Sequence, residues 1–214
     1  MTLAFEKMGV NLVVVLDEPA IDPPAIAIDQ WREIFEDPSV QIEAMAVGLI
    51  RVLSMRQQAE LILQPGRVVI ADKSAVSPTS EVFPRIAANV TKLLADASVP
   101  VNAYGYNIDL TFDPKTSRSA RDELGVRLLR PEVAAVVGAL RCNATLHYEV
   151  AGSARKLQLE ARFSKPDTTV IFGSLNAEYG NGEPPQGEDA ERTAIGALVA
   201  ETEATLEGLF ESGS

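Results

Sequence analysis

The sequence predicts an α+β protein: one antiparallel sheet built from two halves, each a meander of strands followed by a helix, with the helices packed on one face. Strand-like segments follow one another with only short turns between them, and an amphipathic helix closes each run. The 214 residues are 46% hydrophobic and 23% charged, which suits a globular chain with a sizeable core. We therefore expect a single domain spanning residues 1–214, although two separate sheets fit the same pattern.

The first half begins with a strand at residues 10–16, rich in valine, and a proline-rich loop follows it. A short helix is predicted within residues 25–37, because Ile28, Trp31, Ile34 and Phe35 recur at helical spacing before Pro38. The pair Pro65–Gly66 then separates two alternating runs, which indicates a hairpin.

A helix over residues 80–96 closes the first half, with Ser80 as its predicted cap. Its apolar stripe contains Val82, Phe83, Ile86, Val90, Leu93 and Leu94. The order of elements then repeats, which divides the chain into halves 1–98 and 99–214, although no sequence repeat can be aligned.

The second half opens with a strand over residues 101–112. Residues 131–140 fit either a short helix or a buried strand. Three further strands are predicted at 142–150, 154–163 and 168–179, and a long helix at about 189–210.

Alternation divides the strand at 101–112 into two faces. The tyrosines, with Ile108, Leu110 and Phe112, belong to the core face. The opposite row contains Gly105, Asn107, Asp109 and Thr111. We predict Asn107 and Asp109 as residues that meet a ligand or another chain.

The net charge of -11 repels phosphate backbones, so no nucleic-acid partner is expected. The most basic stretch runs from Lys115 to Arg130. We expect a solvated loop there, with docking of an anionic ligand by Arg118 and Arg121 as the functional alternative.

His147 is the only histidine and Cys142 the only cysteine. Their spacing on a strand sends them to opposite faces, which is poor geometry for a shared metal or a catalytic pair. We expect His147 to face solvent or a partner, and we include it among the candidate binding residues.

Asp17, Asp22 and Asp72 follow predicted strands, where carboxylates can hold magnesium. They are the candidates for a metal-dependent hydrolase, although loops beside proline have the same composition. No cofactor is predicted. Because no apolar run is long enough to cross a membrane and no signal peptide or cysteine pair is recognisable, we expect a cytoplasmic protein without a membrane partner.

Tyr104 to Asn107 follow the helix at 80–96, and Leu206 to Glu211 end the last helix with Leu-Phe-Glu. In these patterns the chain resembles a sporadically distributed family of bacterial α+β proteins of about this length with no assigned activity. The resemblance spans most of the chain but transfers no catalytic residue, and Ile108 and Asp109 stand where the family leads us to expect a basic residue. In outline the chain is also similar to bacterial export chaperones.

The sequence therefore favours a binding or protein-interaction module over an enzyme. We expect it to act through an open sheet face or an edge strand, with a protein partner or as a homo-oligomer. The alternative is the metal-dependent hydrolase.

Overall fold

The computed structural model describes residues 3–17, 28–46, 48–72, 82–116, 118–128, 143–161, 169–180 and 182–211. Its strands are β1 (Ala4–Leu16), β2 (Gln41–Ala46), β3 (Leu49–Ser54), β4 (Ala59–Gln64), β5 (Arg67–Asp72), β6 (Val101–Asp113), β7 (Asn143–Val150), β8 (Ser153–Ala161) and β9 (Ile171–Gly180). Its helices are α1 (Ile28–Phe35), α2 (Val82–Asp96), α3 (Ala120–Leu128) and α5 (Glu188–Glu211). The residues predicted as a helix or a strand at 131–140, and Ser80, lie outside this description.

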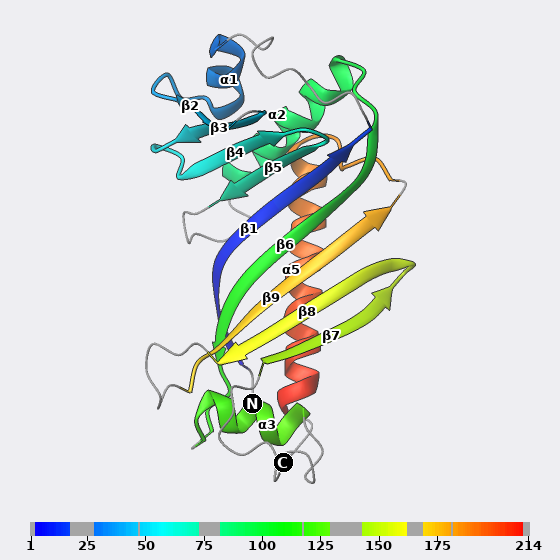
Figure 1. The fold of residues 1–214 in the computed structure, drawn as a ribbon. Helices are drawn as coiled ribbons and strands as arrows, with labels where there is room; N and C mark the ends of the chain where they lie inside the picture. Colours follow the sequence, from blue (N-terminus) through cyan, green and yellow to red (C-terminus); the bar gives the residue numbers. More distant parts are fainter. Residues whose placement is uncertain are drawn as a thin grey trace.

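These strands form one continuous antiparallel sheet in the order β2-β3-β4-β5-β1-β6-β9-β8-β7. The two 13-residue strands β1 and β6 run side by side through its centre (Figure 1). On each side of this central pair, the meander of one half extends outward and a helix follows it. The predicted fold class is therefore confirmed.

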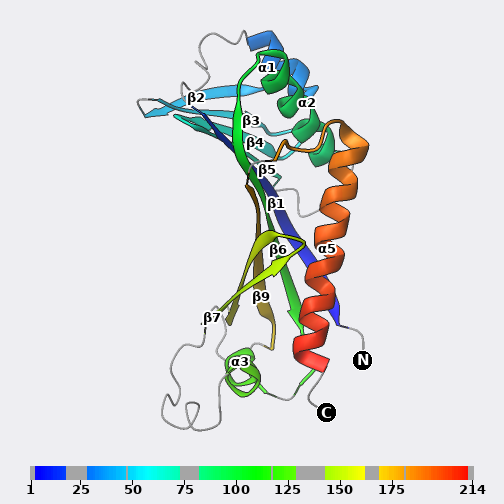
Figure 2. The same ribbon diagram turned by 90° about the vertical axis from the view of Figure 1, so that its right-hand side faces the viewer.

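Helices α1, α2 and α5 lie on the same side of the sheet, and α5 runs along much of its length (Figure 2). Phe210 near the end of α5 packs against Phe112 of β6, with ring centroids 5.0 Å apart. Helix α2 packs against both α5 and β5. The apolar stripe predicted for α2 is correct, because Phe83, Ile86 and Leu94 are buried.

The hairpin between β4 and β5 turns at Pro65 and Gly66, as predicted, with Gln64 paired to Arg67. Gly66 has a φ of 68°. A positive φ is required at the residue that follows proline in a type II turn, and glycine adopts it at little cost. This turn fixes the register of the first meander, because a shift by one residue would move every side chain to the other face.

Helix α3 occupies residues 120–128, within the basic stretch where a solvated loop was expected, so that expectation is wrong. The hydroxyl oxygen of Ser119 accepts a hydrogen bond from the backbone N–H of Asp122, at 3.2 Å, and Ser119 donates to the carboxylate of Asp122, at 2.7 Å. This pair resembles a capping box, and the bond to Ser119 satisfies one helix N–H group that otherwise lacks a partner, that of Asp122.

Candidate functional site

The face of the sheet opposite α2 and α5 carries a continuous row of polar side chains across its second half. Register places Asn11, Asn107, Asn176, Lys156 and His147 opposite one another on β1, β6, β9, β8 and β7. We call the face that carries this row the open face, because α1, α2 and α5 lie on the other side (Figure 2). The side-chain amide of Asn176 donates a hydrogen bond of 2.8 Å to the side-chain oxygen of Asn107.

Asp109 lies in the next row of the same face, opposite Ser174, which is opposite Gln158. The sequence-predicted residues Asn107, Asp109 and His147 therefore share one face. Asn107 and His147 are separated by three strand spacings, about 14 Å. They belong to one surface without contacting each other.

A hollow of about 430 Å³ lies on the open face over Gly105. Val13, Arg67, Asn107 and Glu178 are among its lining residues. Gly105 is itself one of the lining residues, and a Cβ there would lie 2.7 Å from the carbonyl oxygen of Ala177. Any other residue at position 105 would force β6 and β9 apart, so the glycine is a requirement of the sheet that also leaves space above it.

One row of the open face is apolar where it crosses β4, β5 and β1. Ile62, Val69 and Val13 lie opposite one another on β4, β5 and β1, directly before Gly105 in the same row. Val15 flanks this row and is 36% exposed. The open face thus combines an apolar surface on one side of the hollow with amide and charged groups on the other.

On the other face, the hydroxyl of Tyr106 donates a hydrogen bond of 2.5 Å to Glu191 in the first turns of α5. Both side chains are buried, and the second carboxylate oxygen of Glu191 has no hydrogen-bond partner among the described residues. Burial raises the pKa of Glu191 to about 7, although the hydrogen bond from Tyr106 opposes the shift. Burial, with the nearby carboxylate, also raises the pKa of Tyr106. The sequence predicted that the tyrosine belongs to the core but gave no indication of a buried glutamate.

Arg155 of β8 forms a second buried polar contact beneath α5. Its guanidinium lies 2.8 Å from a carboxylate oxygen of Glu201 and 5.2 Å from the centroid of the Tyr179 ring. Burial lowers the pKa of Arg155, but the hydrogen bond to Glu201 and the surrounding charges outweigh it and raise the pKa. Tyr179 in turn stacks on Tyr104, with centroids 4.8 Å apart.

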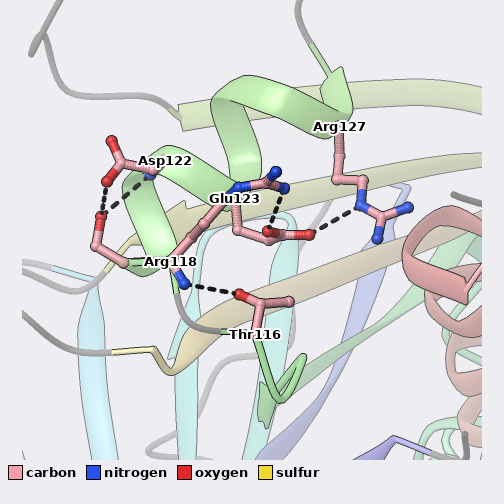
Figure 3. A network of polar contacts seen from close by, with 6 residues as sticks. Thr116, Arg118, Asp122, Glu123 and Arg127 are labelled. Carbon is pink, nitrogen blue, oxygen red and sulfur yellow. Dashed lines mark hydrogen bonds and ion pairs between the residues drawn. The ribbon is translucent and has the colours of Figure 1, made fainter. Parts of the chain in front are cut away.

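The arginines of the predicted anion-docking stretch surround a buried carboxylate. Glu123 of α3 is fully buried and contacts Arg127 at 2.8 Å and Arg118 at 3.4 Å (Figure 3). Burial acts to raise the pKa of Glu123, but the two arginines outweigh it and the pKa is lowered. Arg118, which precedes α3, is therefore engaged in an ion pair within the protein, and Arg121 lies on α3 itself.

The predicted metal ligands do not come together. Asp72 pairs with Val10 of β1, whereas Asp17 follows the end of that strand, seven residues further on and about 23 Å away. Asp22 lies outside the described residues. No group of three potential ligands for a metal ion exists in the part of the chain that the structure describes.

The chain was compared with known proteins by family models and by sequence. No family model matches it, and no curated protein matches it significantly. Within the described residues, none of the helices is both long and apolar enough to span a bilayer. The resemblance to a family of bacterial proteins therefore stays a prediction.

Proposed function

We propose that this protein is a non-enzymatic interaction module that binds a positively charged segment of a partner protein on its open face. One observation carries the proposal. The open face, which α1, α2 and α5 leave uncovered, presents an apolar patch, a hollow and a polar row side by side.

Covering the apolar patch contributes favourable free energy to the association with a partner. Ile62, Val69 and Val15 expose apolar surface on three neighbouring strands around the buried Val13, and each square ångström of apolar surface that a partner covers contributes roughly 25 cal/mol. Beside it, the amides of Asn107 and Asn176 both donate and accept hydrogen bonds, which fixes orientation more than affinity.

The sign of the charge on the open face favours a cationic occupant. Register and alternation place eight acidic and three basic residues on it, an excess of 8 - 3 = 5 negative charges among the described residues. The acidic residues are Glu6, Glu43, Glu60, Asp109, Asp113, Glu149, Glu160 and Glu178, and the basic ones are Arg51, Arg67 and Lys156. A partner segment with lysine or arginine around an apolar core complements this surface.

The same charge disfavours self-association through this face. Two copies meeting face to face would bring together two surfaces that each carry the acidic excess, and like charges oppose such docking. The predicted homo-oligomer therefore needs another contact surface, and it stays a prediction.

Photocrosslinking in cells tests the proposal. A benzoylphenylalanine residue replaces Ile62 or Val69 on the open face, and Ala204, which is exposed on α5, in the control. We expect both open-face positions to crosslink the same protein through a net basic segment, and position 204 to yield no such product.

The identity of the crosslinked peptide decides the result. Equal crosslinking from position 204, or a net acidic peptide at positions 62 and 69, would contradict the proposal. The absence of any product at both open-face positions would do the same, because a docked segment must contact their side chains.

A further inference from the structure

A second surface, on the helical side of the sheet, is independent of the proposed open-face function. A cleft of about 620 Å³ lies between the end of α2, the chain entering β6, and the segment 182–186 that precedes α5. This volume falls within the range of pockets that bind small molecules.

The base of the cleft is buried and largely apolar. Leu94 is 1% exposed and Thr91 2% exposed, and Pro184 is buried. Val99 and Val101 are half-buried and complete the apolar lining. A ligand therefore needs an apolar body to cover the exposed parts of Val99 and Val101 above this buried base.

The charged groups around the cleft are of one sign. Glu183 is the only ionisable residue among its described lining residues. The C-terminal end of α2 also borders it, through Ala95 and Ser98, and the last turn of α2 contains Asp96 and no basic residue. The partial negative charge at this helix end is thus not compensated by its own side chains.

Side-chain hydrogen-bond acceptors are present in the cleft. Gln186 donates one amide hydrogen to the carbonyl of Pro184, at 3.2 Å, and its side-chain oxygen can accept a hydrogen bond. Thr91 donates its hydroxyl hydrogen to the carbonyl of Ala88, at 3.1 Å. A protonated amine has three donors and no acceptor, and so matches such a lining.

A neighbouring cleft has a different charge and sharpens the choice of ligand. It shares Gln186 but is also lined by Arg85 and Lys92 of α2 and by Glu188, the first residue of α5. Its two basic side chains disfavour a cationic ligand there, so the cleft beside Glu183 suits a cation better.

We infer that the cleft between α2 and segment 182–186 binds a small molecule that carries a protonated primary amine on an apolar or aromatic body. The ammonium group contacts Glu183 and the C-terminal end of α2, and the body covers Leu94, Val99 and Val101.

Three probes of matched shape test this inference: 2-phenylethylammonium, neutral 2-phenylethanol and anionic 3-phenylpropionate. Methyl NMR titrations of the 214-residue chain report the dissociation constants and the residues affected. We expect the amine to bind at about millimolar concentration, with shifts at Leu94, Val99 and Val101. The other two probes are expected to bind at least about fivefold more weakly.

Two variants and a control separate charge from shape. Glu183→Gln keeps the shape of an exposed side chain and is expected to weaken amine binding about fivefold. Ala95→Trp, at an exposed position of α2, fills the cleft and is expected to remove binding of the amine altogether. Lys92→Gln, in the neighbouring cleft, leaves the affinity within about twofold.

Several results would overturn the inference. These are equal affinity for all three probes, unchanged amine affinity in Glu183→Gln, and methyl shifts confined to residues outside the cleft. Absence of any shift at saturating probe would do so as well.

Discussion

The two halves of the sheet have the same order of elements but differ in what they bury. One row of paired residues on the helix-covered face crosses the whole sheet, and in the first half it contains Val52, Leu61, Ile70 and Leu12. In the second half, the same row continues with Tyr106, Ala177, Arg155 and Tyr148. This row is thus aliphatic in the first half, whereas in the second half it contains aromatic rings and a buried arginine.

The two halves of the open face differ in the same way, because the row of paired residues there is more polar in the second half. Its first half presents Ile62, Val69 and Val13, and its second half presents Asn107, Asn176 and Lys156. Both halves share the same α+β arrangement, yet their faces differ in polarity. The individual side chains, and not the topology, therefore determine how polar each face is. This is why the fold by itself does not specify a function.

The largest effect is expected in the first half. Leu61→Ala removes a fully buried side chain from the aliphatic row, and it should lower the free energy of unfolding by about 3 to 4 kcal/mol. Denaturant unfolding monitored by circular dichroism measures this change. Ile62→Ala, on the half-buried open face, is the matched control, with an expected loss of about 1 kcal/mol. Equal losses in the two variants would contradict the assignment of the faces.

The second prediction concerns the pH dependence that Glu191 introduces. Its pKa is about 7 in the folded protein and 4.5 in the unfolded chain, so the folded state holds this proton more tightly. The stabilisation is fully present below pH 4.5 and is lost as the pH rises from 4.5 to about 7. The difference between the two pKa values corresponds to about 3 kcal/mol.

Urea unfolding at several pH values between 5 and 8 measures this loss. In Glu191→Gln the pH dependence should largely disappear, because the amide keeps the hydrogen bond with Tyr106 without titrating. Asp37, Asp113 and Glu123 have lowered pKa values and therefore titrate at lower pH. They do not contribute to the pH dependence between pH 5 and 8. An unchanged slope in the variant would show that Glu191 is not the group that titrates.

The third prediction makes the second half resemble the first. Arg155→Leu leaves Glu201 without its buried partner, and should cost about 2 kcal/mol, since Glu201 keeps some contact with water. The double variant Arg155→Leu with Glu201→Leu replaces the pair by apolar groups and should return to within about 1 kcal/mol of the wild type. A double variant that is no more stable than the single one would mean that the ion pair itself stabilises the second half.

The smallest effect is expected on the open face. Asn176→Ala removes the hydrogen bond to Asn107, and should lower the free energy of unfolding by about 0.5 kcal/mol, because both side chains are half-exposed. A loss above about 2 kcal/mol, measured by the same urea unfolding, would place the amide row among the structural contacts of the sheet and not among its binding groups.

Periodicity predicted most of the fold. The alternation at residues 101–112 and the stripe of α2 depend on local spacing, so both could be recognised in the sequence. The same alternation identified the face that carries Asn107, Asp109 and His147. Helix α3 could have been recognised from Ser119 and Asp122, whose spacing is that of a helix cap.

Other parts of the site depend on residues far apart in the chain. Tyr106 and Glu191 are 85 positions apart, and Asn107 and Asn176 are 69 positions apart, so no local pattern links either pair. The requirement for glycine at position 105 likewise follows from the close approach of β9 to β6. The separation of Asp17 from Asp72 follows from the antiparallel pairing of β1 with β5, which a pattern of strand ends does not specify.

The affinity of the crosslinked partner for two charge variants tests the proposed function most directly. Val69→Asp places a charge in the apolar patch of the open face, and Ala204→Asp places the same charge on the exposed side of α5. With the purified partner, isothermal titration calorimetry should give a dissociation constant at least about 100-fold higher for Val69→Asp and one within about twofold of the wild type for Ala204→Asp. If Val69→Asp binds as tightly as the wild type, the open face is not the interaction surface.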